Sequence, residues 1–281
     1  MTGVTNVTED NTLDSVTPRR ASSTILAVFD LDKTIIDTSA SLAYRRPMAQ
    51  RGLISTGEVL KMLTLLGNYM LSAHTEESMV ATKDALTSII KGRDSAALRS
   101  VAQDALTEVI TPFIYAEARE LLDWHKAQGH HIAIVTASAS IMVEPIAAEL
   151  EVDHLIATEL EEIDGTLTGE VLHFNKGTAK TDRIKELADQ QGYDLAESYA
   201  YSDSATDVPM LELAGHPTAV NPDRTLRKLA QERGWEIKNF SRPEPLFPQS
   251  AVLVGAGATL ALLGAAATGL AMWLKSKDDN A

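Results

Sequence analysis

Two aspartates separated by one leucine follow an apolar run near the start of the chain. Residues 25–34 read ILAVFDLDKT, so Asp30 and Asp32 come directly after residues that favour a buried strand. A carboxylate at the end of a buried strand is costly unless a cation or hydrogen-bond donors compensate its charge. More polar groups follow two later strand-like runs or begin a helix, and these are Thr136, Ser138, Lys180, Asp203 and Asp207.

This set of side chains suits phosphoryl transfer. Asp30 can attack phosphorus and form an aspartyl-phosphate, which divides a difficult hydrolysis into two easier steps. A magnesium ion on Asp30 and Asp203 would reduce the repulsion between the nucleophile and an anionic phosphate. Lys180 and the Thr136 hydroxyl would bind phosphoryl oxygens, together with backbone N–H groups of the turn. Asp32 can protonate the leaving alcohol and then activate water.

The elements around these residues alternate between strands and helices. Buried strands are expected at ILAVFD, HIAIVTAS, DHLIATEL, SYAYSD and PTAVN. PTAVN is expected to be the last strand, and LTGEVL is expected to lie in a hairpin or at a sheet edge. Helices are expected at YAEARELLDWHKAQG, ending near Gly129, at KTDRIKELADQQG, ending at Gly192, and at DVPMLELAG. Alternating elements predict an α/β fold with a doubly wound parallel sheet, and such sheets bind ligands at the carboxyl ends of their strands.

A helical insertion interrupts this alternation. Residues 42–110 carry little strand signal and show apolar residues at helical spacing, as in GEVLKMLTLLGNYML and AALRSVAQDALTEVI. We therefore expect a helical cap over about residues 39–111.

Four motifs of the chain resemble those of the haloacid dehalogenase superfamily. They are FDLDKT, VTAS, Lys180 and YSDSATD, and their order and spacing agree over about residues 24–240. Within that superfamily the chain resembles the subfamily IB hydrolases that contain phosphoserine phosphatase. The stretch YSDSATDVPMLELAGHPTAVNPDR is particularly similar to actinobacterial members with a hydrophobic C-terminal tail. The resemblance implies a Rossmann-like core with an inserted helical cap and a Mg²⁺-dependent phosphatase activity.

The resemblance also implies a role for each motif residue. Asp30 would be the nucleophile and Asp32 the acid/base. The phosphate would be bound by Thr136, Ala137 and Lys180. Magnesium would lie on Asp30, Asp203 and the backbone carbonyl of Asp32, with Asp207 supporting the metal or Lys180. If the motif is instead read from Asp32 as DKT, it resembles the phosphorylated motif of ion pumps, with Asp32 as the nucleophile. Thr34 would then lie two residues after the nucleophile, and it cannot donate a proton as Asp32 can when Asp30 is the nucleophile.

Several polar residues have simpler interpretations. Ser138 is expected to cap the following helix, and Asn221 to shape the turn before Pro222. Asp207 is expected to be an active-site carboxylate rather than a helix cap. The histidines at 130, 131 and 173 show no metal-ligand spacing, and ELEEIDG is expected to be a solvated face.

The substrate depends on the cap. Phosphoserine phosphatases place an acidic residue shortly after the first motif to hold the serine ammonium. Here Ser39 and Ser41 occupy that region, Asp37 is closer to the motif, and Arg45 and Arg46 could meet an anionic substrate. Phosphoserine is thus one candidate. The alternatives are a lipid-linked or lipid-precursor phosphomonoester, a phosphotransferase reaction, and a non-catalytic membrane-tethered binding protein.

The composition does not exclude the small phosphorylated substrate that the site residues suggest. The 281 residues carry a formal net charge of -14, with a sequence pI of about 4.9, which argues against a nucleic-acid partner. The chain has no cysteine, so thiol chemistry, disulfides and cysteine-bound zinc are excluded.

The C-terminus is expected to anchor the protein in the cell membrane as a single-pass protein. Residues 251–274 contain no charge and could cross a bilayer core of about 30 Å. Nothing at the N-terminus resembles an export signal, so the catalytic part is expected to be cytoplasmic. A row of small residues in the span could support a homo-oligomer, namely Gly257, Ala261, Ala265 and Gly269. The expected organisation is a disordered leader (1–22), a hydrolase domain (23–243), a linker (244–250), a transmembrane helix (251–274) and a tail (275–281).

Overall fold

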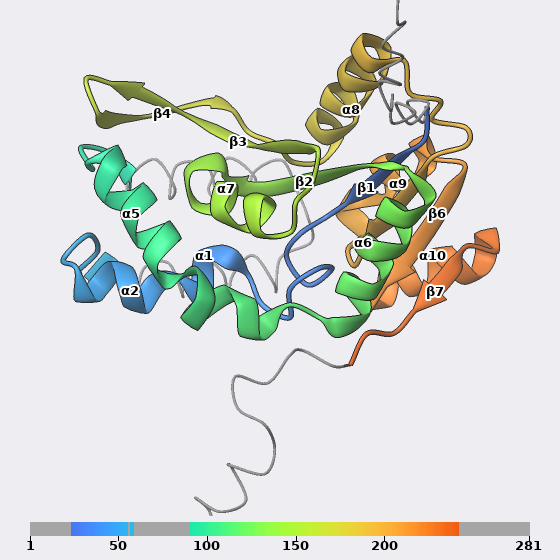
Figure 1. Ribbon diagram of the computed structural model, residues 1–281, viewed down its shortest axis with the longest axis horizontal. Coiled ribbons are helices and arrows are strands. Elements are labelled where there is room, and N and C mark those ends of the chain that lie inside the picture. The colour runs from blue at the N-terminus through green and yellow to red at the C-terminus, as the bar shows by residue number, and fades with distance from the viewer. Residues whose placement is uncertain (1–23, 56, 59–89, 242–281) are drawn as a thin grey trace, which may run out of the picture.

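The computed structural model describes residues 24–55, 57–58 and 90–241. Within them, one sheet has seven strands in the order β4-β3-β2-β1-β5-β6-β7. Neighbouring strands are parallel, except that β3 and β4 form an antiparallel hairpin. The strands are β1 (Leu26–Phe29), β2 (His131–Ala139), β3 (His154–Ile163), β4 (Thr166–His173), β5 (Tyr199–Ser202), β6 (His216–Val220) and β7 (Glu236–Lys238). The predicted doubly wound α/β sheet is therefore confirmed (Figure 1).

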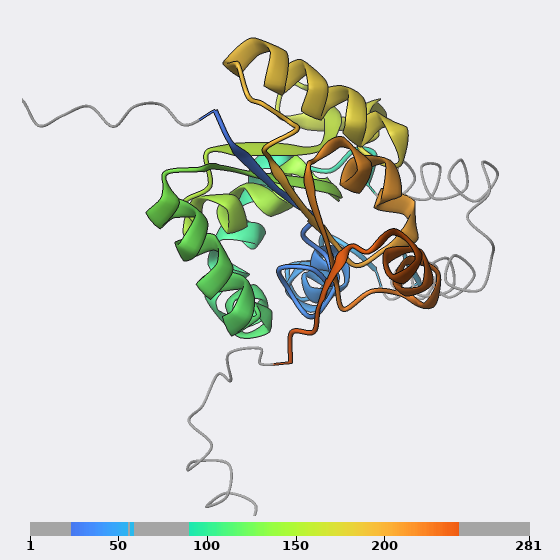
Figure 2. The same ribbon diagram turned by 90° about the vertical axis from the view of Figure 1, so that its right-hand side faces the viewer.

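Helices cover both faces of this sheet (Figure 2). The core helices are α6 (Ala116–Gln128), α7 (Ser140–Glu149), α8 (Thr178–Gln191), α9 (Val208–Leu213) and α10 (Arg224–Arg233). Apolar residues of α6 and α7 pack on one face, and those of α8, α9 and α10 pack on the other. Gly129 and Gly192 end α6 and α8 in left-handed conformations with φ of 78° and 75°, as their positions predict.

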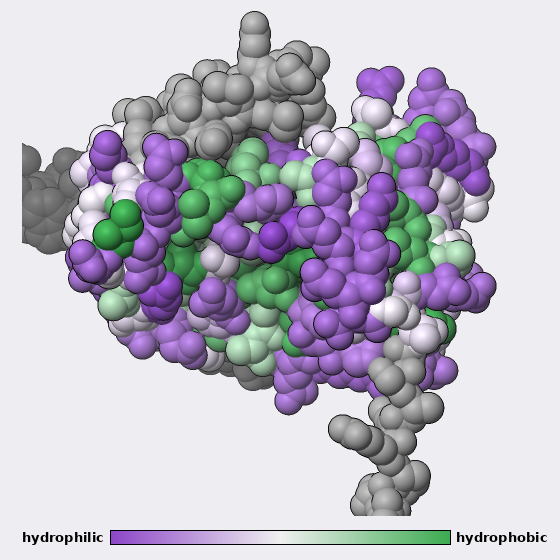
Figure 3. All heavy atoms as spheres, turned by 90° about the horizontal axis from the view of Figure 1, so that it is seen from above, coloured by the Kyte–Doolittle hydropathy of each residue, from purple (hydrophilic) through white to green (hydrophobic). Residues whose placement is uncertain are grey.

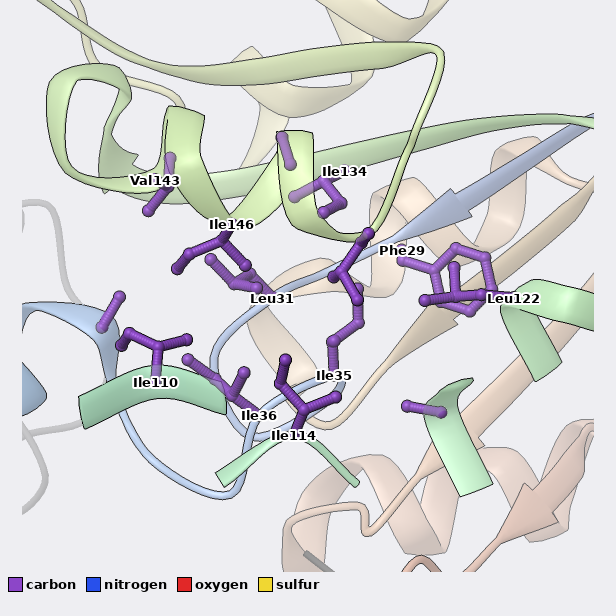
Figure 4. Close-up of a cluster of buried hydrophobic side chains, with 14 of the residues drawn as sticks. Phe29, Leu31, Ile35, Ile36, Ile110, Ile114, Leu122, Ile134, Val143 and Ile146 are labelled. Atoms are coloured by element: carbon purple, nitrogen blue, oxygen red, sulfur yellow. The ribbon is translucent and has the colours of Figure 1, made fainter. Parts of the chain in front are cut away.

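Successive side chains of β1 point to opposite faces of the sheet. Leu26 and Val28 join the α8 side, whereas Ala27 and Phe29 join the α6 side. On the α6 side, the side chains of Phe29 and Leu122 lie together and continue into a cluster of isoleucines (Figure 4). Leu31, between the two aspartates, is fully buried in the same cluster. This packing fixes the direction in which β1 delivers the residues that follow it.

The described part of the insertion is helical, as predicted. It contains α1 (Ala40–Ala43), α2 (Arg45–Gln50) and α5 (Ser95–Ala105), followed by a π-helical turn (Leu106–Ile110) and a 3-10 turn (Thr111–Phe113). The segment GEVLKMLTLLGNYML lies almost entirely outside the described residues.

The base of the cap is hydrogen-bonded to the outer edge of the β3–β4 hairpin, beside which α5 lies (Figure 1). Gly92 N donates to Leu167 O at 2.8 Å, and Leu167 N donates to Arg93 O at 2.9 Å. Arg99 on α5 forms an ion pair with Glu162 at 2.8 Å. These bonds satisfy backbone groups of an edge strand that would otherwise be open to pairing with another chain.

The prediction that the strand at PTAVN, which is β6, would be the last strand was wrong, because β7 follows it in the sheet. Asp223 caps α10 by accepting from Leu226 N at 2.7 Å, and β7 then pairs with β6. A capping aspartate before Leu226 and a terminal Gly234 were signals of α10. The three residues of β7 are too few to show a period.

No helix among the described residues has the length and apolar character needed to cross a bilayer. The predicted span (251–274), its small-residue row, the leader, the linker and the tail lie outside these residues. On the face seen from above, apolar patches lie between broad hydrophilic areas (Figure 3). Large exposed apolar side chains among the described residues are Phe113, Trp124, Ile163 and Leu172.

A buried histidine lies on the α6 side of the sheet. The side chain of His125 has no exposed surface, and its ring nitrogens lie 2.9 Å from His130 Nδ1 and 2.9 Å from the Tyr201 hydroxyl. Burial, with a smaller contribution from His130, lowers the pKa of His125 to about 3. The unfolded chain therefore binds a proton that the folded protein excludes, at pH values between about 6.5 and 3.

We expect this histidine to contribute stability that is fully present above about pH 6.5 and is lost as the pH falls toward 3. Urea unfolding of the wild type and His125→Gln should show a stability difference that shrinks over this window, because glutamine does not titrate. Exposed His216→Gln is the matched control. A wild-type-to-variant difference that stays constant with pH would contradict the assignment.

Candidate active site

A buried lysine joins two of the predicted carboxylates. Lys180 Nζ lies 2.8 Å from Asp30 Oδ1 and 2.8 Å from Asp207 Oδ2. The exposed fractions of Lys180, Asp30 and Asp207 are 2%, 7% and 3%, so these charges are largely shielded from solvent. Burial alone would lower the pKa of Lys180, but Asp207 and Asp30 raise it overall. The lysine is thus a permanent cation at the carboxyl end of the sheet.

Strand register places these groups together. Phe29 on β1 is aligned with Tyr201 on β5, and Asp30 N donates to Tyr201 O at 2.9 Å. Asp30 and Asp203 consequently follow adjacent strands at the same sheet edge. Ser202 Oγ donates to Asp207 at 2.8 Å and fixes the carboxylate that faces Lys180. Sequence reasoning did not select Ser202.

Burial, and to a smaller degree the clustering of carboxylates, raises the pKa values of Asp30 and Asp203. Burial raises the pKa of Asp30 to about 7, while Lys180 opposes the rise. Burial, with the nearby Asp30 and Asp207 carboxylates, raises the pKa of Asp203 to about 8. Both groups therefore gain a proton near neutral pH unless another cation stabilises the charged forms.

This donor set fits magnesium. Mg²⁺ prefers oxygen ligands, and a divalent cation would relieve the repulsion that raises the pKa values of Asp30 and Asp203. Among the residues that the structure describes, no three His, Asp or Glu side chains form a group that could hold a metal ion. Two carboxylates would therefore need other oxygen ligands, such as the backbone carbonyl that the resemblance implies at Asp32.

Asp32 occupies a different environment from Asp30. Its Oδ1 accepts from Ala40 N at 2.8 Å, and its Oδ2 accepts from Ser138 Oγ at 3.0 Å. Burial raises the pKa of Asp32, although these two hydrogen bonds oppose the rise. The two aspartates are thus distinguished by their partners, with a lysine on Asp30 and neutral donors on Asp32.

Thr136 and Ala137 lie in β2 just beyond its pairing with β1. Phe29 is aligned with Ile134, so Asp30 and Thr136 lie one and two residues beyond that pair. The Thr136 hydroxyl accepts from Ser138 N at 3.1 Å, and Ala137 O accepts from Thr158 Oγ1 at 2.7 Å. Both residues are therefore held rigidly at the sheet edge.

Asn175 fixes this edge from the loop before α8. Its amide donates to Thr136 O and to Ile156 O, both at 2.9 Å. The side chain is fully buried. Sequence reasoning missed Asn175, because an asparagine in a loop before a helix suggests only a turn or a cap.

The interpretation of Ser138 as a helix cap was wrong. Helix α7 begins at Ser140, its N-cap is Ala139, and no side chain caps it. Strand β2 continues one residue beyond Ser138 and turns the hydroxyl toward Asp32. Asp207 occupies the N-cap position of α9, but its side chain makes no capping bond and contacts Lys180 instead.

The turn role of Asn221 is confirmed. Its φ is 42°, and its side chain bonds both backbone polar groups of Phe240 at 3.0 and 2.9 Å.

The residues after the first motif contact protein groups. Asp37 Oδ1 accepts from the Tyr115 hydroxyl at 2.7 Å and lies 3.7 Å from Lys33 Nζ. Arg45 donates to Leu42 O at 2.8 Å. Asp37, the first acidic residue after the motif, is thus already paired.

Comparisons with known proteins agree with this geometry. Residues 27–212 match the model of the haloacid dehalogenase-like hydrolases. A protein of Mycobacterium tuberculosis named a probable phosphatase is 43% identical over 220 residues, covering 78% of this chain and 77% of the relative. Phosphoserine phosphatase SerB1 of the same species is 34% identical over 253 residues, covering 88% and 79%.

Solved structures show the same fold. A protein of unknown function from Bordetella pertussis Tohama I has a TM-score of 0.68 and 31% identity, covering 77% of this chain and 98% of that one. A substrate-bound phosphoserine phosphatase has a TM-score of 0.57 at 21% identity, covering 78% and 94%. The matched residues include both aspartates of the first motif, Lys180, Asp203 and Asp207, and the chain belongs to the haloacid dehalogenase-like hydrolase family.

Proposed function

We propose that the protein hydrolyses phosphomonoesters through an aspartyl-phosphate on Asp30 and requires magnesium. The observation that carries this proposal is the buried Lys180 placed 2.8 Å from both Asp30 and Asp207. Such a lysine orients the nucleophile and can bind the negative charge of a transferring phosphoryl group. The curated relatives named as phosphatases support the same activity.

Each residue of the candidate active site has a separate role in this reaction. Asp30 attacks phosphorus while Lys180 binds and orients its carboxylate. Thr136 and Ala137 present polar groups from the adjacent strand. Asp32 delivers a proton to the leaving oxygen and later removes one from the attacking water. Magnesium on Asp30 and Asp203 would neutralise charge on the phosphoryl group and its nucleophile.

Phosphoserine is the first substrate to test, because two M. tuberculosis relatives are named phosphoserine phosphatases. Asp37 is paired with Tyr115 and Lys33, which argues against Asp37 as the ammonium ligand. A panel should therefore include phosphomonoesters without an ammonium group and lipid-precursor phosphates. Added alcohols would reveal phosphotransfer as a phosphorylated alcohol product.

Attachment to a membrane through residues 251–274, with a cytoplasmic catalytic part, remains part of the proposal. Its support is the uncharged length of that segment. Full-length protein recovered without detergent in the soluble fraction would contradict it. Cross-linking of wild type and of a Gly257→Leu, Gly269→Leu variant would test association through the small-residue row.

Metal removal should stop the reaction. EDTA is expected to abolish hydrolysis of every substrate on the panel, and added Mg²⁺ to restore it. Apparent Mg²⁺ affinity should fall at least about tenfold from pH 8 to pH 6, because protons compete for Asp30 and Asp203. Titration calorimetry at both pH values measures this. Full activity in EDTA would contradict the metal requirement.

A further inference from the structure

The carboxylate of Asp32 is held by one donor from the cap side and one from the core. Ala40 N, at the start of α1, donates to Oδ1 at 2.8 Å, and Ser138 Oγ on β2 donates to Oδ2 at 3.0 Å. We propose that Ser138 is a positioning residue, which orients Asp32 for proton exchange with the leaving oxygen. This inference rests on the proposed phosphatase function.

Ser138 is suited to this role because it is itself fixed. It is 6% exposed, and its backbone N donates to the Thr136 hydroxyl at 3.1 Å. The preceding carbonyl, of Ala137, accepts from Thr158 on β3. A hydroxyl held in this way limits rotation of the Asp32 carboxylate.

The hydrogen bond also leaves Asp32 able to transfer a proton. Each carboxylate oxygen has two lone pairs, and the bonds from Ala40 and Ser138 use one on each oxygen. A hydroxyl can turn from donor to acceptor when Asp32 becomes protonated, which a backbone N–H cannot do. Ser138 can therefore stay bonded to Asp32 on both sides of the proton transfer.

The two bonds have separable consequences. Loss of Ser138 leaves Ala40 as the described donor to Asp32, so the carboxylate becomes free to rotate about its last side-chain torsion. Attack by Asp30 does not depend on that orientation, whereas protonation of a poor leaving group does. The effect of Ser138 should therefore depend on the leaving group.

The test compares kcat/KM for an alkyl phosphomonoester and for 2,4-dinitrophenyl phosphate, whose leaving group needs no proton. Ser138→Ala is expected to lower the first about 10- to 100-fold and the second less than about threefold. Ser138→Thr, which keeps a hydroxyl, should recover much of the alkyl activity, whereas the similarly shaped Ser138→Val should not. Exposed Ser100→Ala on α5 is the matched control. If Ser138→Ala fails to fold, the comparison of Ser138→Thr with Ser138→Val still tests the inference.

The background Asp32→Asn provides a second readout. If Ser138 acts through Asp32, adding Ser138→Ala to Asp32→Asn should cause no further loss with the alkyl substrate. Equal losses on both substrates, or an unchanged effect in the Asp32→Asn background, would overturn the inference while wild type remains active. A wild-type protein that hydrolyses neither substrate with Mg²⁺ would instead overturn the proposed function itself.

Discussion

Asp30→Asn is expected to lower phosphomonoester hydrolysis on the order of 10⁴-fold or more, because an amide cannot act as the attacking oxygen anion. The substitution keeps the size and shape of the side chain. The amide oxygen can still accept from Lys180, which lies 2.8 Å from Asp30 Oδ1. The loss should therefore reflect the missing nucleophile and not a missing contact.

Stability measurements separate this loss from unfolding. The pKa of Asp30 is raised to about 7, mainly by burial, so its ionised form destabilises the metal-free folded protein. Above about pH 7, the free energy of unfolding of Asp30→Asn should equal or exceed that of the wild type. Exposed Asp182→Asn on α8 is the control and should keep full activity.

Acid quenching with ³²P-labelled 2,4-dinitrophenyl phosphate, whose leaving group needs no proton, distinguishes the two aspartates. Wild type and Asp32→Asn should yield labelled protein, since both retain the nucleophile, whereas Asp30→Asn should yield none. Label that is retained in Asp30→Asn and lost in Asp32→Asn would move the nucleophile to Asp32. The contacts oppose that outcome, because Lys180 bonds Asp30 whereas Asp32 is bonded by Ala40 and Ser138.

The site could be located from sequence because strand ends in a parallel sheet share one edge. Apolar runs identified β1, β2 and β5, and the residues that follow them meet in the structure as predicted. Lys180 could be added because it begins a helix that packs on that sheet. This reasoning needs only local periodicity and the topology rules of α/β folds.

The missed features depend on contacts between distant segments. Capping preferences describe a serine and the helix next to it, but the partner of Ser138 lies 106 residues away in the chain. Asn175 likewise bonds backbone carbonyls of β2 and β3, which no local pattern reveals. The bonds between the cap base and β4 depend on how the cap and the β3–β4 hairpin meet in space.

The second large effect is expected for Lys180→Met. Replacement of the ammonium by a thioether removes the cation that binds both Asp30 and Asp207 and would bind the phosphoryl oxygens. Removal of one such electrostatic group typically costs about 10²- to 10³-fold in rate, so kcat/KM should fall by at least that factor. Lys185→Met, an exposed substitution on the same helix, should leave kcat/KM unchanged.

Lys180→Met should also be destabilised in a pH-dependent way. Removal of one partner of a buried ion pair typically costs about 3–5 kcal/mol, because the remaining charge is left without a partner. Lys180 lowers the pKa of Asp30, so without it this pKa rises further above the unfolded value. A raised carboxyl pKa gives stability that is present at low pH and is lost as the pH rises through the folded pKa. The stability difference from wild type should therefore be larger near pH 8.5 than near pH 6, when urea unfolding is measured without metal.

Adding Asp207→Asn to Lys180→Met separates the two roles of the lysine. The double variant loses one of the two uncompensated charges, so part of the stability should return, particularly at high pH. Activity should not return, because the ammonium of Lys180 is missing from both variants. Recovery of activity together with stability would show that Lys180 supports only the fold, and that the phosphoryl group is bound by other residues.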